Sequence, residues 1–297
     1  MGEEIPEKHF EESKMKAQKE NKYNRLLPYV HDIEEEAEKL FIDIKTNLIR
    51  SVLGREMRPG CAMWTSRLIK YIKIYGYKFS KQDHIALIKL FYELLIIPDL
   101  EPTRVNKCAS TLTVLLKKKY LLSREDLQLD WRPLYDMCVR VTEKTKRDLG
   151  MYRYSASFEG TLFNAIRMCR VYFPASATQE ILDEFKQYLC PFNTCDMSYS
   201  MEYMELFLPC HVKPSEAGIS YKLWFDELMI LWNNCQEACP WENYLMYMMT
   251  NLARYQIGYI DWQPHIANMF VRSLFQRSLL MFKNYGVVEN VIYISLV

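Results

Sequence analysis

The stretch SKQDHIALIKLFYELLIIP, residues 80–98, contains the features that decide the fold. It opens with a capping box, because Ser80 and Asp83 stand three residues apart and can satisfy amide donors that a first helical turn leaves unpaired. Apolar residues then recur at helical spacing, and Pro98 closes the pattern. We therefore predict an amphipathic helix that starts after Ser80, with His84 in its first turn.

The same kind of pattern extends from Asp32 to about Met281. The first helix is expected to stop at Gly54 and the second at Gly76. Ser123 and three following residues repeat the capping box before the next apolar positions. Later helices are predicted over residues 157–173, 178–189, 197–208, 219–232, 241–256 and 264–281, with Pro102 and Pro133 in the first turns of two earlier ones.

The spacing of the predicted helices favours a repeat architecture. Helix starts recur every ~23 residues, so a helix pair takes about 46 residues, which lies within the range of HEAT and armadillo repeats. One helix pair cannot bury its apolar face alone, so neighbouring pairs stack into a continuous core. We predict an all-α fold, an α-solenoid of HEAT/armadillo-like helix pairs. A single compact helical bundle has a similar periodicity and stays open as the alternative.

The organisation along the chain follows from composition. Residues 1–22 alternate Glu and Lys and are predicted to form a charged, flexible leader. Residues 23–282 form the HEAT-like helical region. Residues 283–297 are β-branched and apolar, unlike the polar outer face of a terminal repeat, so we expect an atypical tail.

Bulk composition narrows the class of protein. The 297 residues are 49% apolar and 25% charged, which is typical of a globular chain with a substantial core. The net charge of +1 is only mildly uneven between the two halves, too little to indicate nucleic-acid binding. Nine irregularly placed cysteines favour reduced thiols in the cytosol or nucleus. A signal peptide and an apolar run of the ~20 residues that a membrane span needs are both missing, so we expect a soluble intracellular protein.

Candidate metal and catalytic groups are weak. Cys190, Cys195, Cys210 and His211 lack the paired short spacings that tetrahedral zinc prefers, and we expect buried thiols instead. The pair of cysteines at 235 and 239 has the spacing of a helix core. The five histidines are scattered and complete no Ser-His-Asp or Cys-His arrangement.

The adjacent carboxylates Asp226 and Glu227 diverge by about 100° on a helix, so we expect both to face solvent rather than share a substrate. We therefore predict no enzyme activity, no catalytic residue, no metal and no cofactor. The basic run Lys117–Lys119, with Arg124 nearby, complements a helix dipole, with a nuclear-import or anion-binding patch as the alternative. An aromatic stripe is interpreted as core packing, with a peptide groove as the alternative; it comprises Tyr221, Trp224, Phe225, Leu228 and Trp232.

Nine short segments, in order and at matching spacing over roughly residues 21–275, resemble the N-terminal region of the giant HEAT-repeat proteasome activators. They are YNRLLPY (23–29), YGYKFSKQDH (75–84), LKKK (116–119), LLS (121–123), WRPLYDM (131–137), YFPA (172–175), CPF (190–192), LWFDEL (223–228) and GYIDW (258–262). Any one segment alone is a weak signal, and together they are highly specific.

The resemblance implies an α-solenoid that caps the proteasome core particle and opens its gate without ATP or ubiquitin. It further implies degradation of peptides and acetylated proteins such as histones, roles in DNA repair and spermatogenesis, and a place in nucleus and cytoplasm. Members of this family are several times longer than this chain. The penultimate residue of this chain is Leu296, where the family's docking tail has an aromatic residue, so we expect this piece alone to lack the docking element.

No functional residue is carried over from the family, and the matching Trp and Asp residues are interpreted as structural. A different class of function stays open as the alternative. In it, the chain is a solenoid adaptor or transport scaffold that binds partner peptides in a concave groove.

Overall fold

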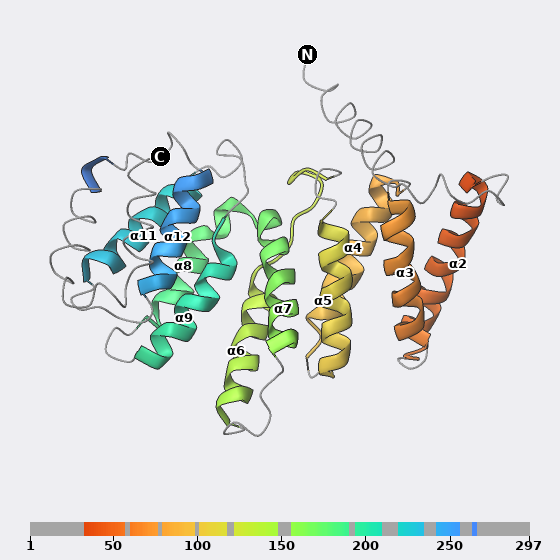
Figure 1. Ribbon diagram of the computed structural model, residues 1–297, viewed down its shortest axis with the longest axis horizontal. Coiled ribbons are helices and arrows are strands. Elements are labelled where there is room, and N and C mark those ends of the chain that lie inside the picture. The colour runs from red at the N-terminus through yellow and green to blue at the C-terminus, as the bar shows by residue number, and fades with distance from the viewer. Residues whose placement is uncertain are drawn as a thin grey trace, which may run out of the picture. The chain divides into compact units, whose positions relative to one another are not determined.

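The computed structural model describes residues 33–56, 60–76, 79–98, 101–117, 122–147, 156–189, 194–209, 219–234, 242–255 and 263–265. All regular structure within these ranges is helical (Figure 1). The helices are α2 (Ile33–Leu53), α3 (Ala62–Tyr75), α4 (Lys81–Leu95), α5 (Pro102–Leu116), α6 (Arg132–Arg147), α7 (Ala156–Cys169), η5 (Arg170–Tyr172), η6 (Ala175–Ala177), α8 (Thr178–Lys186), α9 (Thr194–Phe207), α11 (Ser220–Asn234) and α12 (Glu242–Tyr255). The predicted all-α fold of HEAT-like helix pairs is confirmed.

Packing divides the chain into two compact units. The first comprises residues 1–127 and 143–168, and the second comprises residues 128–142 and 169–297. In the first unit α2 packs on α3, α4 packs on α5, and α3 lies beside α5, so two helix pairs stand next to each other. In the second unit α11 packs on both α8 and α12, and α12 packs on α9. Each unit therefore shows the pairing of neighbours expected of a repeat protein.

Local chemistry explains where the first helices begin and end. The Ser80 hydroxyl accepts the Asp83 amide at 3.0 Å and caps α4, as predicted. Pro102 is the first residue of α5, where its missing amide donor is harmless. Gly76 follows the last residue of α3. His84 lies in the first turn of α4, and its Nε2 is 2.9 Å from the Leu115 carbonyl oxygen of α5.

Two predicted elements differ from the structure, and the last part of the chain is mostly untested. The second capping box closes a turn rather than a helix: the Asp126 carboxylate accepts the Ser123 amide at 2.9 Å, and the next helix begins at Arg132. The α-helix predicted to reach residue 173 stops at Cys169 and tightens into η5, because Pro174 forces Phe173 into the extended conformation. The helix predicted over 264–281 and the tail after residue 282 lie outside the described residues, apart from helical residues 264–265.

The core of the first unit is aromatic and aliphatic. Tyr71 and Phe79 are buried and pack with Phe41, with ring centroids 5.1–5.7 Å apart. Not every apolar residue of α2 is in the core, since Leu40 and Ile49 each keep 42% of their accessible surface. Among the described helices none is both long and apolar enough to cross a membrane.

Candidate functional site

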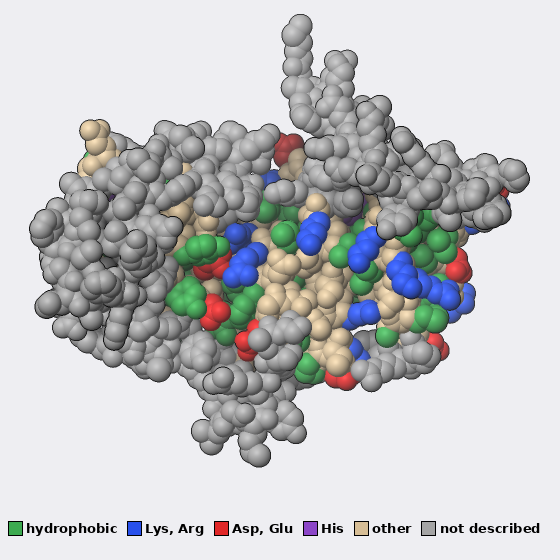
Figure 2. Space-filling model, in the orientation of Figure 1, with side chains coloured by type: hydrophobic (Ala, Val, Ile, Leu, Met, Phe, Trp, Pro, Cys, Tyr) green, Lys and Arg blue, Asp and Glu red, His purple; other side chains and the backbone are tan. Residues whose placement is uncertain are grey.

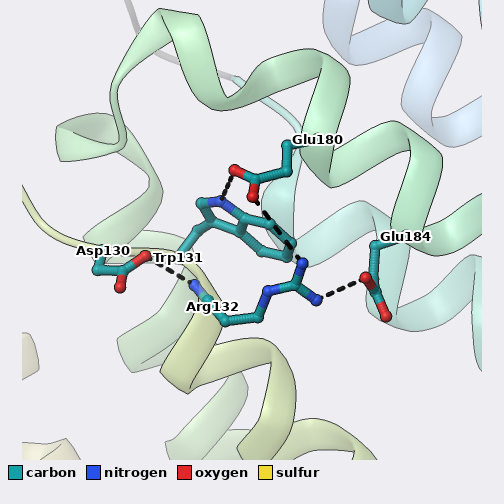
Figure 3. A network of polar contacts seen from close by, with 5 residues as sticks. All are labelled: Asp130, Trp131, Arg132, Glu180 and Glu184. Carbon is teal, nitrogen blue, oxygen red and sulfur yellow. Dashed lines mark hydrogen bonds and ion pairs between the residues drawn. The ribbon is translucent and has the colours of Figure 1, made fainter.

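The best-defined polar constellation lies in the second unit, where α6 meets α8 (Figure 3). Arg132 Nη1 is 2.5 Å from Glu184 Oε2, and its Nη2 is 4.0 Å from Glu180 Oε1. The indole Nε1 of Trp131 donates to Glu180 Oε2 at 3.4 Å. Glu180 and Glu184 stand one helical turn apart on α8, so both carboxylates face the same guanidinium. We call these four residues, together with Asp130, the Arg132 network.

The sequence around residue 131 positions this network. The Asp130 carboxylate accepts the Arg132 amide at 3.1 Å and satisfies a donor at the start of α6. One residue before Asp130, the Leu129 amide donates to the Tyr172 carbonyl at 3.0 Å and holds the segment that precedes α6 against η5. The Arg132 guanidinium then lies over the Trp131 ring, 4.4 Å from its centroid. Stacking and pairing together fix the side chain.

The charges of the Arg132 network attract one another across the contact between α6 and α8. The hydrogen bond to Glu184 raises the pKa of Arg132 above its ordinary value, and the Glu180, Glu184 and Asp136 charges add to this effect. The carboxylates of Glu180 and Glu184 are engaged with Trp131 or Arg132. These two carboxylates are therefore poor candidates for a general base. Their contacts with Trp131 and Arg132 join α6 to α8.

An aromatic cluster lies beside the network and has Phe207 of α9 at its centre. The rings of Trp131, Tyr135, Phe173 and Phe185 lie 5.6–6.4 Å from the Phe207 ring, measured between centroids. All five side chains are buried. The rings come from the start of α6 with the residue before it, from α8, from α9 and from the turn before η6, so burying them brings four segments together.

Two further ion pairs connect helices of the second unit. Arg170 Nη1 is 3.2 Å from the Glu205 carboxylate and 2.8 Å from the Glu205 carbonyl oxygen. Lys186 Nζ is 2.9 Å from Glu227 Oε2, and this hydrogen bond raises the pKa of Lys186. The expectation that Asp226 and Glu227 both face solvent is thus correct for Asp226 and wrong for Glu227, which is 8% exposed. The two carboxylates do diverge, as predicted.

Most of the candidate metal-binding cysteines and the candidate His211 are not described by the structure. Cys190, Cys210, His211, Cys235 and Cys239 lie outside the described residues, as does the side chain of Cys195. Where the structure does describe His, Cys, Asp and Glu side chains, they form no group of three or more that could hold a metal ion.

Two of the four described thiols, those of Cys138 and Cys169, are unsuited to nucleophilic chemistry. Cys138 and Cys169 are fully buried, and burial raises the pKa of both thiols, that of Cys138 to about 12. The thiolate is the reactive form of cysteine, so these two groups are inert.

The described part of the basic run and the aromatic stripe lie where they were expected. Lys117 follows the last residue of α5 and is exposed, while Lys118 and Lys119 lie outside the described residues. The stripe on α11 is buried at all five positions, with at most 6% exposure at Phe225. Its interpretation as core packing is confirmed, and the five side chains are unavailable to a peptide groove.

Several residues of these contacts carried no sequence signal as a site. Arg170, Glu205 and Glu184 look like ordinary surface charges along the chain, because their partners lie 35–52 residues away. The motif residues Trp131 and Trp224, by contrast, are buried, as their interpretation as structural requires. The segments WRPLYDM, YFPA and LWFDEL all contribute side chains to the contacts described above.

Comparison with known proteins gives a consistent result. No family model matches the chain. It is 45% identical over 257 residues to "Proteasome activator complex subunit 4" of Xenopus laevis and 46% identical to "Proteasome activator complex subunit 4A" of Danio rerio. A more distant match, "Proteasome activator subunit 4" of Arabidopsis thaliana, is 25% identical over 149 residues. The two animal matches take in 86% of this chain, which spans only 14% of the length of these curated relatives.

Proposed function

This chain is a relative of the proteasome activators named subunit 4, and from that premise we propose that it forms part of the HEAT-repeat wall of such an activator. The observation that carries the proposal is the 45% identity over 257 residues, which takes in 86% of the chain. In this role the chain contributes helix pairs to a cap on the proteasome core particle. The chain forms part of the wall of the cap, and the core particle carries out peptide hydrolysis.

The finer part of the proposal follows from the family resemblance. The activator acts without ATP or ubiquitin, and it promotes degradation of peptides and of acetylated proteins such as histones, in DNA repair and spermatogenesis. Histone contacts are assigned to parts of the longer relatives that this chain does not cover. We place the protein in the nucleus and cytoplasm.

The contacts of the second unit support a structural role. Arg132, Lys186 and Arg170 each join one helical segment to another, and the Phe207 cluster fills the space between four segments. The described carboxylates at these positions are paired with cations. A helix stack held in this way presents a rigid surface, which suits a cap better than a reaction centre.

Cross-linking in living cells tests the proposal. The chain is expressed with an affinity tag in the context of a full-length activator, cross-linked, purified and analysed by mass spectrometry, with the tag alone as the control. We expect core-particle subunits among the cross-linked partners in the absence of added ATP and ubiquitin, and we expect the 297-residue chain by itself to stimulate the peptidase activity of core particles little or not at all. Recovery of import or scaffold partners without any proteasome subunit would overturn the proposal in favour of the solenoid adaptor.

A further inference from the structure

Positive charge gathers on one layer of the first unit. The helices α3 and α5 lie side by side. Together they carry Arg67, Lys70, Lys73, Arg104 and Lys107, and neither helix contains an Asp or a Glu. Figure 2 shows Lys and Arg side chains over these two helices, with Asp and Glu at the margins of this area. We call these five residues the α3/α5 basic face.

The basic side chains are placed so that one ligand can reach several of them. Arg67, Lys70 and Lys73 are exposed and follow one another at intervals of three residues along α3. Such residues are neighbours on a helix surface, and the three span about 9 Å along the axis. Packed helices lie ~8–10 Å apart, so the half-buried Arg104 and Lys107 of α5 form a second row at a similar distance.

The neighbouring layer differs in its charge balance. Helix α2 carries five carboxylates, and α4 contains Asp83 and Glu93. Cations of this layer are matched with carboxylates, as in the pair Lys45–Asp83 at 2.6 Å and the pair Lys81–Asp126 at 2.6 Å. On the basic face the nearby Glu101, at the N-cap of α5, pairs with Arg104 at 3.4 Å. Among the four helices α2 to α5, positive charge is therefore in excess on α3 and α5.

From this arrangement we propose that the α3/α5 basic face is a docking surface for an acidic polypeptide segment of a partner protein. Two short rows of cations match an extended or helical segment that carries several carboxylates. A long polyanion fits less well, because it would run from α3 onto the carboxylates of α2. The sequence pI of about 7.5 is also far below that of typical nucleic-acid-binding domains. The proposal is independent of the role in proteasome activation.

Fluorescence anisotropy with the whole chain tests the proposal. The probe is a short labelled glutamate-rich peptide, compared with a glutamine-rich peptide of the same length and with a labelled oligothymidylate. We expect the acidic peptide alone to bind well at low ionic strength and to be released as sodium chloride is added, since salt screens exposed charges. The variant K70E/K107E should bind it about tenfold more weakly, because each reversal replaces an attraction by a repulsion.

A charge-matched control makes the test specific to this face. The variant K39E/K89E changes the net charge equally, at exposed positions of α2 and α4. It should keep the affinity of the unmodified chain within about twofold. Circular dichroism melts confirm that the variants fold, and the milder K70Q/K107Q should show a smaller loss. Equal losses in both charge-reversal variants, displacement of the peptide by oligothymidylate, or no binding to the unmodified chain would each overturn the proposal.

Discussion

At the scale of single residues, Arg170 and Glu205 form an ion pair that is buried on both sides. Their side chains are 6% and 4% exposed. Removing two ions from water costs hydration, which only close pairing and additional hydrogen bonds offset. The Arg170 guanidinium pairs closely with the Glu205 carboxylate and also donates a hydrogen bond to the Glu205 carbonyl oxygen. Such a pair adds little net stability and is costly to break.

We predict that Glu205→Ala lowers the free energy of unfolding by ~3 kcal/mol, because it leaves a buried guanidinium without its counter-charge. The double variant Arg170→Met/Glu205→Leu removes both charges and should recover most of this loss. Urea unfolding followed by circular dichroism measures both. A double variant as unstable as Glu205→Ala would show that the charge pair is not the reason for the loss.

At the scale of elements, the two capping boxes have the same spacing and different outcomes. In α4 the Ser80 hydroxyl accepts the Asp83 amide and also donates to the Asp83 carboxylate at 2.7 Å. Around Ser123 the carboxylate accepts the serine amide, and the chain turns without entering a helix. Asp126 is also 2.6 Å from Lys81 of α4, so its carboxylate serves a tertiary contact as well.

We predict that Ser80→Ala destabilises the protein by about 1 kcal/mol, the typical effect of losing a helix N-cap. Ser123→Ala is the matched control and should cost clearly less, because no helix starts at that residue. The difference is measured by thermal unfolding of both variants under the same conditions. If the two substitutions have equal effects, the hydroxyl of Ser80 contributes no specific capping energy.

At the scale of the whole molecule, carboxylates paired with lysines couple stability to pH. Burial opposes ionisation of Asp83, but hydrogen bonds from Lys45 and Ser80 and the charge of Lys45 outweigh it and lower the pKa of the carboxyl group. For Asp126 burial is likewise outweighed, by Lys81 and Ser123, and its pKa is lowered too. A carboxyl with a lowered pKa in the folded state binds its proton more readily in the unfolded chain.

The stabilisation from both carboxylates is therefore fully present above the ordinary aspartate pKa of 3.8 and is lost as the pH falls through the lower folded values. We predict that the melting temperature falls over this acidic range and that Asp83→Asn/Asp126→Asn flattens the fall. Each pair is partly exposed and worth up to about 1 kcal/mol. The exposed Asp226→Asn is the control and should keep the slope; a double variant with an unchanged slope would contradict the assignment.

Much of the fold could be predicted because helix boundaries depend on residues close together in the chain. Ser80 caps through an amide three residues away, Pro102 begins a helix by lacking a donor, and Gly76 follows the end of α3. The nine short motifs likewise established the family resemblance, because their order and spacing belong to the sequence itself. Local patterns were insufficient at the second capping box, where Asp126 also pairs with Lys81 of α4 and no helix starts.

The sequence alone determined that the chain is a series of amphipathic helices and that nine of its segments resemble those of the proteasome activators. Only the tertiary structure decided which helices contact one another. That choice also set the pairing of Lys45 with Asp83, 38 residues apart, and of Arg132 with Glu184, 52 residues apart. The burial of Glu227 and the two adjacent rows of cations on α3 and α5 have the same origin. The physical reason is that a helical period fixes which residues share a face, whereas the partner of that face is chosen by the packing of the whole stack.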